Sequence, residues 1–388
     1  MKFNKKIFLY FFLTTITLVL AILLIKHAVN ESGDFKTYLN AALNFIHGHS
    51  IYDRNDYLPF VYLPIWALFF VPWALLGTSL ACILWCLMNC ALLYGSILLL
   101  SKQFHLNPFK DKKLFIPLVF LFYPIAKTFL NGQINILLVF GLILAVHFFH
   151  RKILSAFFFS LFISAKVSPL LLLPYFILKK QFRLCFAIVG WLIFYILFPT
   201  LFIGWEKNIE SLKQYVSLVT HHPHLLSPHN HSITGILMRH FQNAFPHYQS
   251  ILFLGTAILF GFIILFSCRK SIENAIENLW YELSIVLLSM FFITPIVWEH
   301  HLIILLPTLF LIFIYRDSIT IGWKISLLAT WVLFAFSSKT FVGQTISRNI
   351  LFDHGVVLWW LGTLLAFLLF SSLREKKYLR LGGVEPPS

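Results

Sequence analysis

Asp34 is the side chain whose type and position most directly indicate chemistry. It follows the first long apolar run, Ile7 to Ile25, by one short loop. A carboxylate just beyond a membrane helix can act as a general base on a substrate held at the bilayer surface. The alternative is a solvated loop acid at a helix N-terminus. The choice depends on whether other polar motifs reach the same side of the membrane as Asp34.

The elements that position Asp34 must be membrane helices, because the composition excludes a soluble protein. The chain is 59% hydrophobic and 12% charged, with a mean hydropathy of +0.82, whereas soluble domains average about 25% charged residues. Apolar runs recur from end to end, and a helix needs about 20 such residues to span a bilayer. We therefore predict an all-α, polytopic protein with a single transmembrane domain over 1–375. Its outer loops would cover about 29–78 and 204–250, and 376–388 would be a disordered cytoplasmic tail.

Hydropathy indicates about twelve spans. They run roughly over 7–28, 79–100, 114–130, 133–149, 153–165, 168–178, 183–203, 251–268, 279–297, 301–315, 319–341 and 356–373. Segment 60–77 can either cross the membrane or lie along its outer surface. The stretch 153–178 is either one long helix or two short ones broken at Lys166 and Pro169.

Positive charge decides between these topologies. If 60–77 lies on the outer surface and 153–178 forms two helices, most of the 30 basic residues fall on the cytoplasmic side. The alternative topology nearly removes that asymmetry, so the positive-inside rule favours the first. Both termini are then cytoplasmic, and the first apolar run is a retained helix and not a cleaved signal. The positive net charge follows from these loops and predicts no nucleic-acid partner.

The favoured topology gathers the polar motifs on the outer side of the membrane. Asp34, Lys166, 131–135, the 204–250 loop and 298–301 all reach that face. Ionisable groups at membrane depth are costly and are usually functional. A polar set drawn from distant stretches of sequence onto one face is what an active site needs.

Five short motifs follow one another along the chain. They are Asp34-Phe35 with Tyr38 and Tyr62, Asn131-Gly132-Gln133-Ile134-Asn135, Lys166-Val167-Ser168-Pro169, Asn230-His231-Ser232, and Thr294-Pro295-Ile296-Val297-Trp298-Glu299-His300-His301. In this order they resemble the polyprenyl-phosphate-mannose-dependent mannosyltransferases of glycosyltransferase family 87, within the membrane-embedded GT-C class. The resemblance covers about residues 34 to 310.

The resemblance implies a reaction and its partners. Such an enzyme moves a hexose, mannose in that family, from a polyprenyl-phosphate donor in the lipid to an acceptor hydroxyl outside the cytoplasmic membrane. The acceptor is a glycan or glycolipid, and no nucleotide sugar takes part. The anomeric carbon is inverted. Asp34 matches the catalytic aspartate of the family and would be the general base.

The remaining site residues receive roles from the same match. His300, His301 and Lys166 are candidates to bind the donor phosphate, whose charge grows as it leaves. Gln133 and Asn135 carry paired donors and acceptors suited to sugar hydroxyls. Further substrate-binding candidates are Tyr38, Tyr62, Asn230, Ser232 and Glu299.

Three of these residues have other interpretations. Lys166 in an apolar stretch can extend its amine to the membrane interface. Gln133 and Asn135 can simply join helices by hydrogen bonds.

The acidic candidates also have alternatives. Glu299 can be the ionic partner of His300 or of Arg348. Asp53 and Asp56 are loop acids or turn formers, and either could be the base if Asp34 is not.

The sequence supports no cofactor. The histidines from His221 to His231 match no closed zinc site, and Pro223 interrupts them. Too few acids surround Asp34 to argue for a divalent metal. Cys82, Cys86 and Cys90 repeat every four residues along one helical stripe, which is typical of small-residue packing and not of a metal site.

Two further classes of protein were weighed against the enzyme. A transporter or flippase of lipid-linked sugar would show repeated halves and polar groups at mid-bilayer, and this chain shows neither. A structural membrane subunit would leave the costly polar groups without a purpose.

Overall fold

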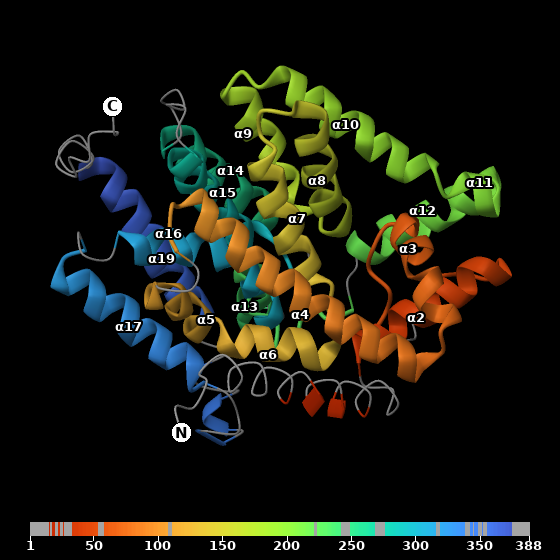
Figure 1. The fold of residues 1–388 in the computed structure, drawn as a ribbon, viewed down its shortest axis with the longest axis horizontal. Coiled ribbons are helices and arrows are strands. Elements are labelled where there is room, and N and C mark those ends of the chain that lie inside the picture. The colour runs from red at the N-terminus through yellow and green to blue at the C-terminus, as the bar shows by residue number, and fades with distance from the viewer. Residues whose placement is uncertain are drawn as a thin grey trace, which may run out of the picture. The chain divides into compact units, whose positions relative to one another are not determined.

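The described part of the chain is entirely helical in the computed structural model (Figure 1). The structure describes 33–52, 58–107, 111–220, 223–241, 249–267, 276–315, 319–337 and 355–374, with isolated residues at 15–26 and 342–351. Several predicted features lie outside the described residues: Asp53, Asp56, His221, Arg348 and the tail 376–388. Only isolated residues of the predicted first span over 7–28 are described.

The chain divides into two compact units. Unit 1 comprises Met1–Val167, Phe182–Pro223 and Glu299–Leu306, and unit 2 comprises Ser168–Gln181, His224–Trp298 and Pro307–Ser388. The boundary after Val167 falls one residue beyond Lys166. The single domain over 1–375 stays a prediction.

Unit 1 carries the elements that surround Asp34. Its helices are α2 (Asp34–His47), α3 (Pro64–Leu75), α4 (Thr78–Gln103), η1 (Lys112–Phe115), α5 (Ile116–Phe120), α6 (Phe122–Asn131), α7 (Asn135–His147), α8 (Lys152–Ala165), α10 (Phe182–Leu197), α11 (Thr200–Ile203), α12 (Trp205–Thr220) and the 3-10 helix η3 (Glu299–Leu305). Within it α7 packs against α4 and α8, and α8 packs against α10.

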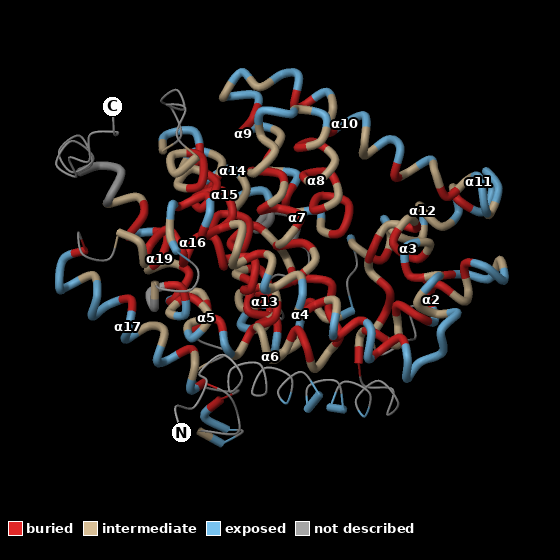
Figure 2. The backbone as a smooth tube through the Cα atoms, viewed as in Figure 1, coloured by how far each residue is buried: buried red, intermediate tan, exposed pale blue. Residues whose placement is uncertain are grey.

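Unit 2 has a core built on one apolar helix. Its elements are η2 (Ser168–Leu171), α9 (Leu172–Leu178), α13 (Ile233–Phe241), α14 (Gln249–Ser267), α15 (Ile276–Ile293), α16 (Leu306–Ile314), which begins one residue before the boundary, α17 (Ile321–Ala335) and α19 (Val356–Arg374). The central helix is α15, which packs against α14 and α19 and is buried from Leu283 to Ile293 (Figure 2).

Fewer helices than the predicted twelve are long enough to span a bilayer. Among the described residues, Thr78–Gln103, Phe182–Ile203 and Ile276–Ile293 meet the requirements of length and hydropathy. A fourth candidate is the pair α6 and α7, which is bent by 118° at the break between its halves. The other apolar helices are shorter, so the count of twelve is not confirmed.

Individual boundaries show where hydropathy misleads. The stretch 153–178 forms two short helices broken at Lys166, as predicted. The predicted span 114–130 is divided between η1, α5 and α6, where Pro117 and Pro124 lie, and a proline ring is incompatible with an uninterrupted helical hydrogen-bond ladder. The predicted span 301–315 opens as the 3-10 turn η3. Segment 60–77 contains the short helix α3.

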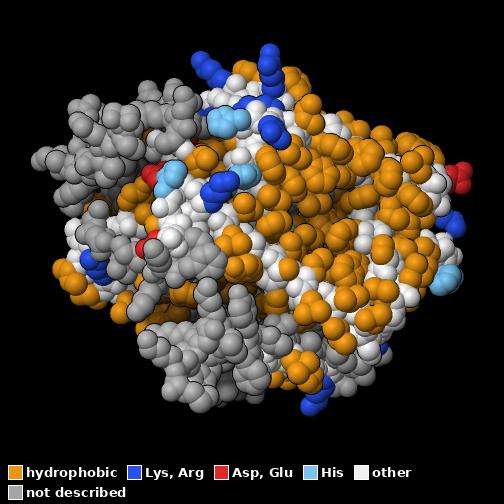
Figure 3. Space-filling view, in the orientation of Figure 1, with side chains coloured by type: hydrophobic (Ala, Val, Ile, Leu, Met, Phe, Trp, Pro, Cys, Tyr) orange, Lys and Arg blue, Asp and Glu red, His pale blue; other side chains and the backbone are white. Residues whose placement is uncertain are grey.

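The exposed face of unit 1 suits lipid. On α10 the side chains of Phe186 and Ile193 are 77% and 52% exposed, and Leu201 on α11 is 77% exposed. Hydrophobic side chains crowd that region of the surface (Figure 3). Contiguous exposure of large apolar groups is unfavourable in water but not in a bilayer, so the protein is embedded in a membrane.

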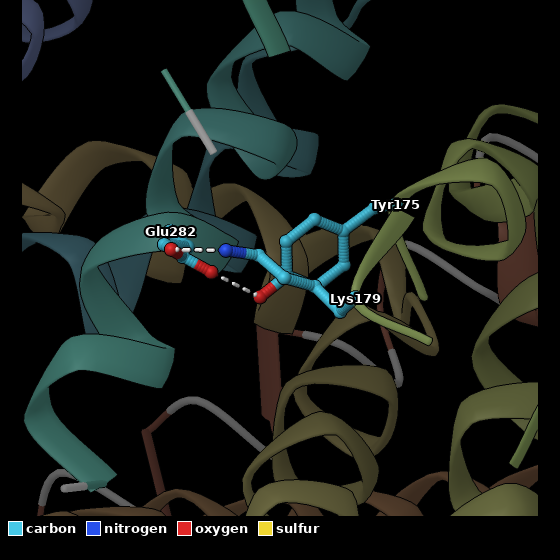
Figure 4. A network of polar contacts seen from close by, with 3 residues as sticks. All are labelled: Tyr175, Lys179 and Glu282. Atoms are coloured by element: carbon cyan, nitrogen blue, oxygen red, sulfur yellow. Dashed lines mark hydrogen bonds and ion pairs between the residues drawn. The ribbon is translucent and has the colours of Figure 1, made fainter. Parts of the chain in front are cut away.

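A buried ion pair joins α9 to α15 in unit 2 (Figure 4). The Lys179 Nζ lies 2.6 Å from the Glu282 Oε1, and the Tyr175 hydroxyl donates to Glu282 Oε2 over 2.8 Å. The Lys179 and Glu282 side chains are only 3% and 13% exposed. Because both charges are desolvated, removing either one would leave the other buried without a counter-charge.

We expect Glu282→Leu to destabilise the protein by about 3–5 kcal/mol, because it leaves a buried lysine without its carboxylate. Tyr175→Phe should cost about 1–2 kcal/mol for one hydrogen bond. Adding Lys179→Met to Glu282→Leu should recover most of the loss. Unfolding in mixed micelles measures all three, and a double variant as unstable as Glu282→Leu would contradict the pairing.

Candidate active site

Asp34 is the first residue of α2 and is held there by the apolar face of that helix. A carboxylate in the first turn interacts favourably with the helix dipole. The next residue, Phe35, stacks on Trp85 with ring centroids 5.3 Å apart. One turn after Asp34, Tyr38 stacks on Phe70 with ring centroids 4.8 Å apart. These rings fix the start of α2 against α3 and α4, while Asp34 itself stays half-buried.

Gln133 reaches Asp34 because the chain turns sharply between α6 and α7. Gly132 ends α6 with φ 62°, a left-handed conformation that favours glycine. The N–H groups of Gly132 and Gln133 bond back to the carbonyls of Phe129 and Thr128. The Trp85 Nε1 donates to the Gly132 carbonyl over 3.0 Å. The turn is therefore tied to α4, and Gln133 points from it toward α2.

A hydrogen-bonded chain connects Asp34 to two tyrosines. The Gln133 Nε2 donates to Asp34 Oδ2. The Gln133 Oε1 accepts from the Tyr38 hydroxyl over 2.9 Å, and the Tyr62 hydroxyl lies 3.1 Å from that of Tyr38. An ionised carboxylate only accepts, and a tyrosine can donate. The order of groups thus sets the orientation of the amide, which in turn orients the Asp34 carboxylate.

Tyr62 is in turn fixed by its surroundings. The Tyr52 hydroxyl donates to the Tyr62 carbonyl over 2.6 Å. Four residues on, the Trp66 Nε1 donates to the Ser164 hydroxyl over 3.2 Å. That bond connects α3 to the last turn of α8, two residues before Lys166.

Lys166 lies at the C-terminus of α8, where the chain becomes extended (φ −144°, ψ 136°). It is half-buried, and its charge and that of Asp34 act on each other. Burial raises the pKa of Asp34 to about 6, against the opposing effects of Gln133 and Lys166. Burial lowers the pKa of Lys166 to about 7, and Asp34 opposes that shift. Burial thus brings the pKa values of both groups close to neutral pH.

The 3-10 turn η3 brings the histidine motif beside the same groups. Glu299 and His300 are buried, and the rings of His300 and His301 meet nearly at right angles with centroids 4.7 Å apart. The Thr128 hydroxyl donates to the His300 carbonyl over 3.4 Å, which joins η3 to α6. The charges of Lys166 and Glu299 both act on His300.

Lys127 is a residue that the sequence analysis missed. It lies on α6, with its amine 5.7 Å from the centroid of the Tyr123 ring, and its charge acts on His300. The available signal was a lysine inside the apolar run 114–130, one helical turn before Gly132, where a charge is costly.

Asn135 is fully buried at the start of α7. Both polar atoms of its side chain have no hydrogen-bond partner among the described residues. The interpretation that Asn135 joins helices by hydrogen bonds therefore finds no contact to support it, whereas Gln133 has such contacts with Asp34 and Tyr38.

Asn230 and Ser232 lie in unit 2, where they brace the backbone that precedes η3. The Asn230 Nδ2 donates to the carbonyls of Leu225 and Pro295, and its Oδ1 accepts from the N–H groups of Ser232 and Val297. The Ser232 hydroxyl donates to the Pro295 carbonyl over 2.7 Å. Both donors and both acceptor positions of Asn230 are engaged. Its substrate-binding role stays a prediction beside this structural one.

The histidine-rich loop is organised around an aromatic ring. The rings of His224 and His229 lie 5.9 Å and 6.4 Å from Trp298 between centroids. Among the described residues, no group of three or more histidine, cysteine or acidic side chains is placed to hold a metal ion. On α4 the thiols of Cys82 and Cys86 are buried and unoxidised.

The comparison with known families decides the class of the protein. The model of glycosyltransferase family 87 matches residues 60–295, more than half of the chain. The chain belongs to this family. The protein is thus a membrane glycosyltransferase, as its motifs predict. No curated protein and no solved structure matched the chain.

The family match ends short of both flanks of the site. It includes Gln133 and Lys166 but neither Asp34 nor His300. Hydrogen bonds connect these two residues to the matched segment. Gln133 donates to Asp34, and the Thr128 hydroxyl on α6 donates to the His300 carbonyl. The geometry therefore connects both residues to elements that lie within the matched segment.

We expect Asp34 to titrate with a midpoint of about 6 in the ligand-free protein. Lys166→Met should raise this midpoint, because it removes a positive charge that stabilises the carboxylate. Gln133→Leu should also raise it, because it removes the hydrogen-bond donor that stabilises the ionised form. Lys166→Arg is the matched control and should leave it nearly unchanged. Infrared difference spectra of the protonated carboxyl, with Asp34→Asn as the blank, measure the midpoint. An unchanged midpoint in Lys166→Met would contradict the pairing.

Proposed function

We propose that the protein transfers a hexose, mannose in the first instance, from a polyprenyl-phosphate donor to a hydroxyl of a glycan or glycolipid, with inversion. The observation that carries the proposal is the aimed carboxylate: Asp34 accepts from Gln133 and shares a site with Lys166 and the histidine turn η3. The family supplies the transfer of a sugar. The membrane-embedded structure supports a donor carried by lipid.

Inversion requires one direct displacement. The acceptor oxygen attacks the anomeric carbon as the bond from that carbon to the phosphate oxygen breaks. The acceptor proton passes to Asp34, and the electron pair leaves with the polyprenyl phosphate. A base must lie within hydrogen-bond reach of the hydroxyl, and Oδ2 of Asp34 already faces Gln133. In this mechanism the second oxygen, Oδ1, takes the proton.

Charge that develops on the leaving phosphate needs donors and cations. Lys166, His300 and His301 supply them in this proposal, and Lys127 adds a second amine whose charge reaches His300. Glu299, which is buried beside His300, would orient a sugar hydroxyl or the histidine. Desolvation of these groups strengthens each interaction with the substrate.

The ring and amide groups around Asp34 suit a sugar. Tyr38, Tyr62 and Gln133 form a connected set of donors and acceptors, and aromatic faces pack well on the apolar face of a pyranose. The site needs no metal in this mechanism. We place it on the outer side of the cytoplasmic membrane with both termini inside, as the distribution of basic loops favours.

Asp34→Asn should reduce transfer by about 10²–10⁴-fold, the usual contribution of a general base, while donor binding survives. The assay is transfer from a short-chain polyprenyl-phosphate-mannose to a panel of mannosides by purified protein in detergent. The isosteric asparagine keeps the hydrogen bond from Gln133 when its carbonyl oxygen takes the place of Oδ2. Gln133→Leu serves as a control for misalignment of the side chain at position 34. Turnover near that of the wild type would assign the base to another residue. No transfer by wild-type protein that binds the donor would direct the test to lipid flipping in liposomes.

His300→Ala should lower kcat by about 10²-fold and change KM much less, because the charge on the phosphate grows toward the transition state. Steady-state kinetics with saturating acceptor separate the two constants, provided that chemistry limits turnover. His301→Ala is the comparison, since His301 is more exposed than His300. An effect of His300→Ala on KM alone would indicate a positioning role.

A further inference from the structure

We propose that the N-terminus of α7, together with the Asn135 amide, binds the phosphate of the lipid-linked donor. The proposal rests on the proposed function and adds a second set of phosphate ligands to it. The observation behind it is a buried helix start with no side-chain cap, whose first side chain has no hydrogen-bond partner among the described residues.

The first turn of α7 is uncapped. Its N-cap residue is Ile134, which has helical dihedrals and no side-chain oxygen, and no side chain caps the helix. The first N–H to bond within the helix is that of Leu138, which donates to the Ile134 carbonyl over 3.0 Å. The N–H groups before it have no intrahelical acceptor. The exposed fractions of Ile134, Asn135 and Ile136 are all 1% or less, so bulk water does not hydrogen-bond to their N–H groups.

Asn135 adds an independent observation at the same place. Its side chain is 0% exposed, and neither its Oδ1 nor its Nδ2 has a partner among the described residues. Burial of an amide with no hydrogen bond costs about 1–3 kcal/mol. The Cα–Cβ bond of a helical residue tilts toward the helix N-terminus, which directs the Asn135 side chain toward the uncapped turn. Such a cost is recovered when a ligand occupies the site.

The polar groups around this junction are unevenly satisfied. The carbonyls of Thr128, Phe129 and Gly132, where α6 ends, all accept hydrogen bonds. The first N–H groups of α7, by contrast, have no intrahelical acceptor to which they can donate. The N–H groups of this turn and the Asn135 Nδ2 can all donate to the acceptor oxygens of an ionised phosphate. A helix N-terminus also favours negative charge, which a phosphate brings and a sugar hydroxyl does not.

Nearby groups strengthen the assignment. The turn η3, with His300, packs against both α6 and α7, and the charges of Lys166 and Lys127 act on His300. Gln133, two residues before Asn135, hydrogen-bonds to Asp34. A phosphate at the α7 N-terminus would thus lie beside the cations that serve it and near the carboxylate that takes the acceptor proton.

The test compares binding of a short-chain polyprenyl phosphate with binding of the corresponding polyprenol, both to purified protein in detergent. Wild-type protein should bind the phosphate at least tenfold more tightly. Asn135→Leu should reduce phosphate binding about tenfold and leave polyprenol binding unchanged. Because it removes an unsatisfied buried amide, Asn135→Leu should also leave the unfolding temperature unchanged or raise it. A purely structural asparagine would lower it.

Two further variants make the test independent of folding. Asn135→Asp should fold, since an acid is favoured in the first turn of a helix, yet repel the phosphate and reduce its binding about a hundredfold. Asn89→Leu is the matched control: Asn89 is a buried asparagine of unit 1 whose Nδ2 donates to the Trp85 carbonyl of its own helix. It should bind the phosphate as the wild type does.

Each alternative outcome identifies what is wrong. Wild-type preference for the phosphate, retained in both Asn135→Leu and Asn135→Asp, would overturn this site and leave the proposed donor intact. No preference for phosphate over polyprenol in the wild type would overturn the donor itself. Displacement of the lipid phosphate by inorganic phosphate at equal concentration would assign the site to a free anion and overturn its assignment to the donor.

Discussion

The site depends on one amide. Gln133 donates to Asp34 and accepts from Tyr38, so a single side chain orients the carboxylate and connects it to the aromatic wall. The amide can do this only because Gly132 adopts a left-handed conformation and Trp85 holds the carbonyl of that glycine. A change at any of these positions would move the others. The short link between α6 and α7 thus positions the side chain that orients Asp34.

Burial gives the site its acid–base character. A carboxylate in water has too low a pKa to take a proton readily at neutral pH, and a lysine has too high a pKa to share one. Half-burial brings the pKa values of Asp34 and Lys166 closer together, to about 6 and about 7. The charge of each group limits how far burial can shift the pKa of the other. A base matched to the working pH gives the most efficient proton transfer, and the membrane setting supplies the low polarity that such matching needs.

Unit 2 contributes polar contacts of another kind. The Asn230 side chain uses its whole hydrogen-bonding capacity on backbone groups, and Glu282 is neutralised by Lys179 and Tyr175. These groups are satisfied within the protein. Asn135 in unit 1 is not, and this contrast separates a polar group that stabilises the fold from one that awaits a ligand. The same residue type carries both roles, so identity alone could not distinguish them.

The membrane class, the family motifs and the break at Lys166 could all be predicted from the amino-acid sequence, because hydropathy, prolines and motif order are local properties. Which motifs meet depends instead on packing between distant segments. Asp34 and Gln133 are separated by 99 positions, and nothing near either residue specifies the other. Lys127 carried a local signal, a charge inside an apolar run, but its closeness to η3 comes from packing between distant segments. The lengths of the helices could not be predicted from hydropathy either. Hydropathy shows which segments can lie in a bilayer, whereas packing and prolines decide where each helix ends.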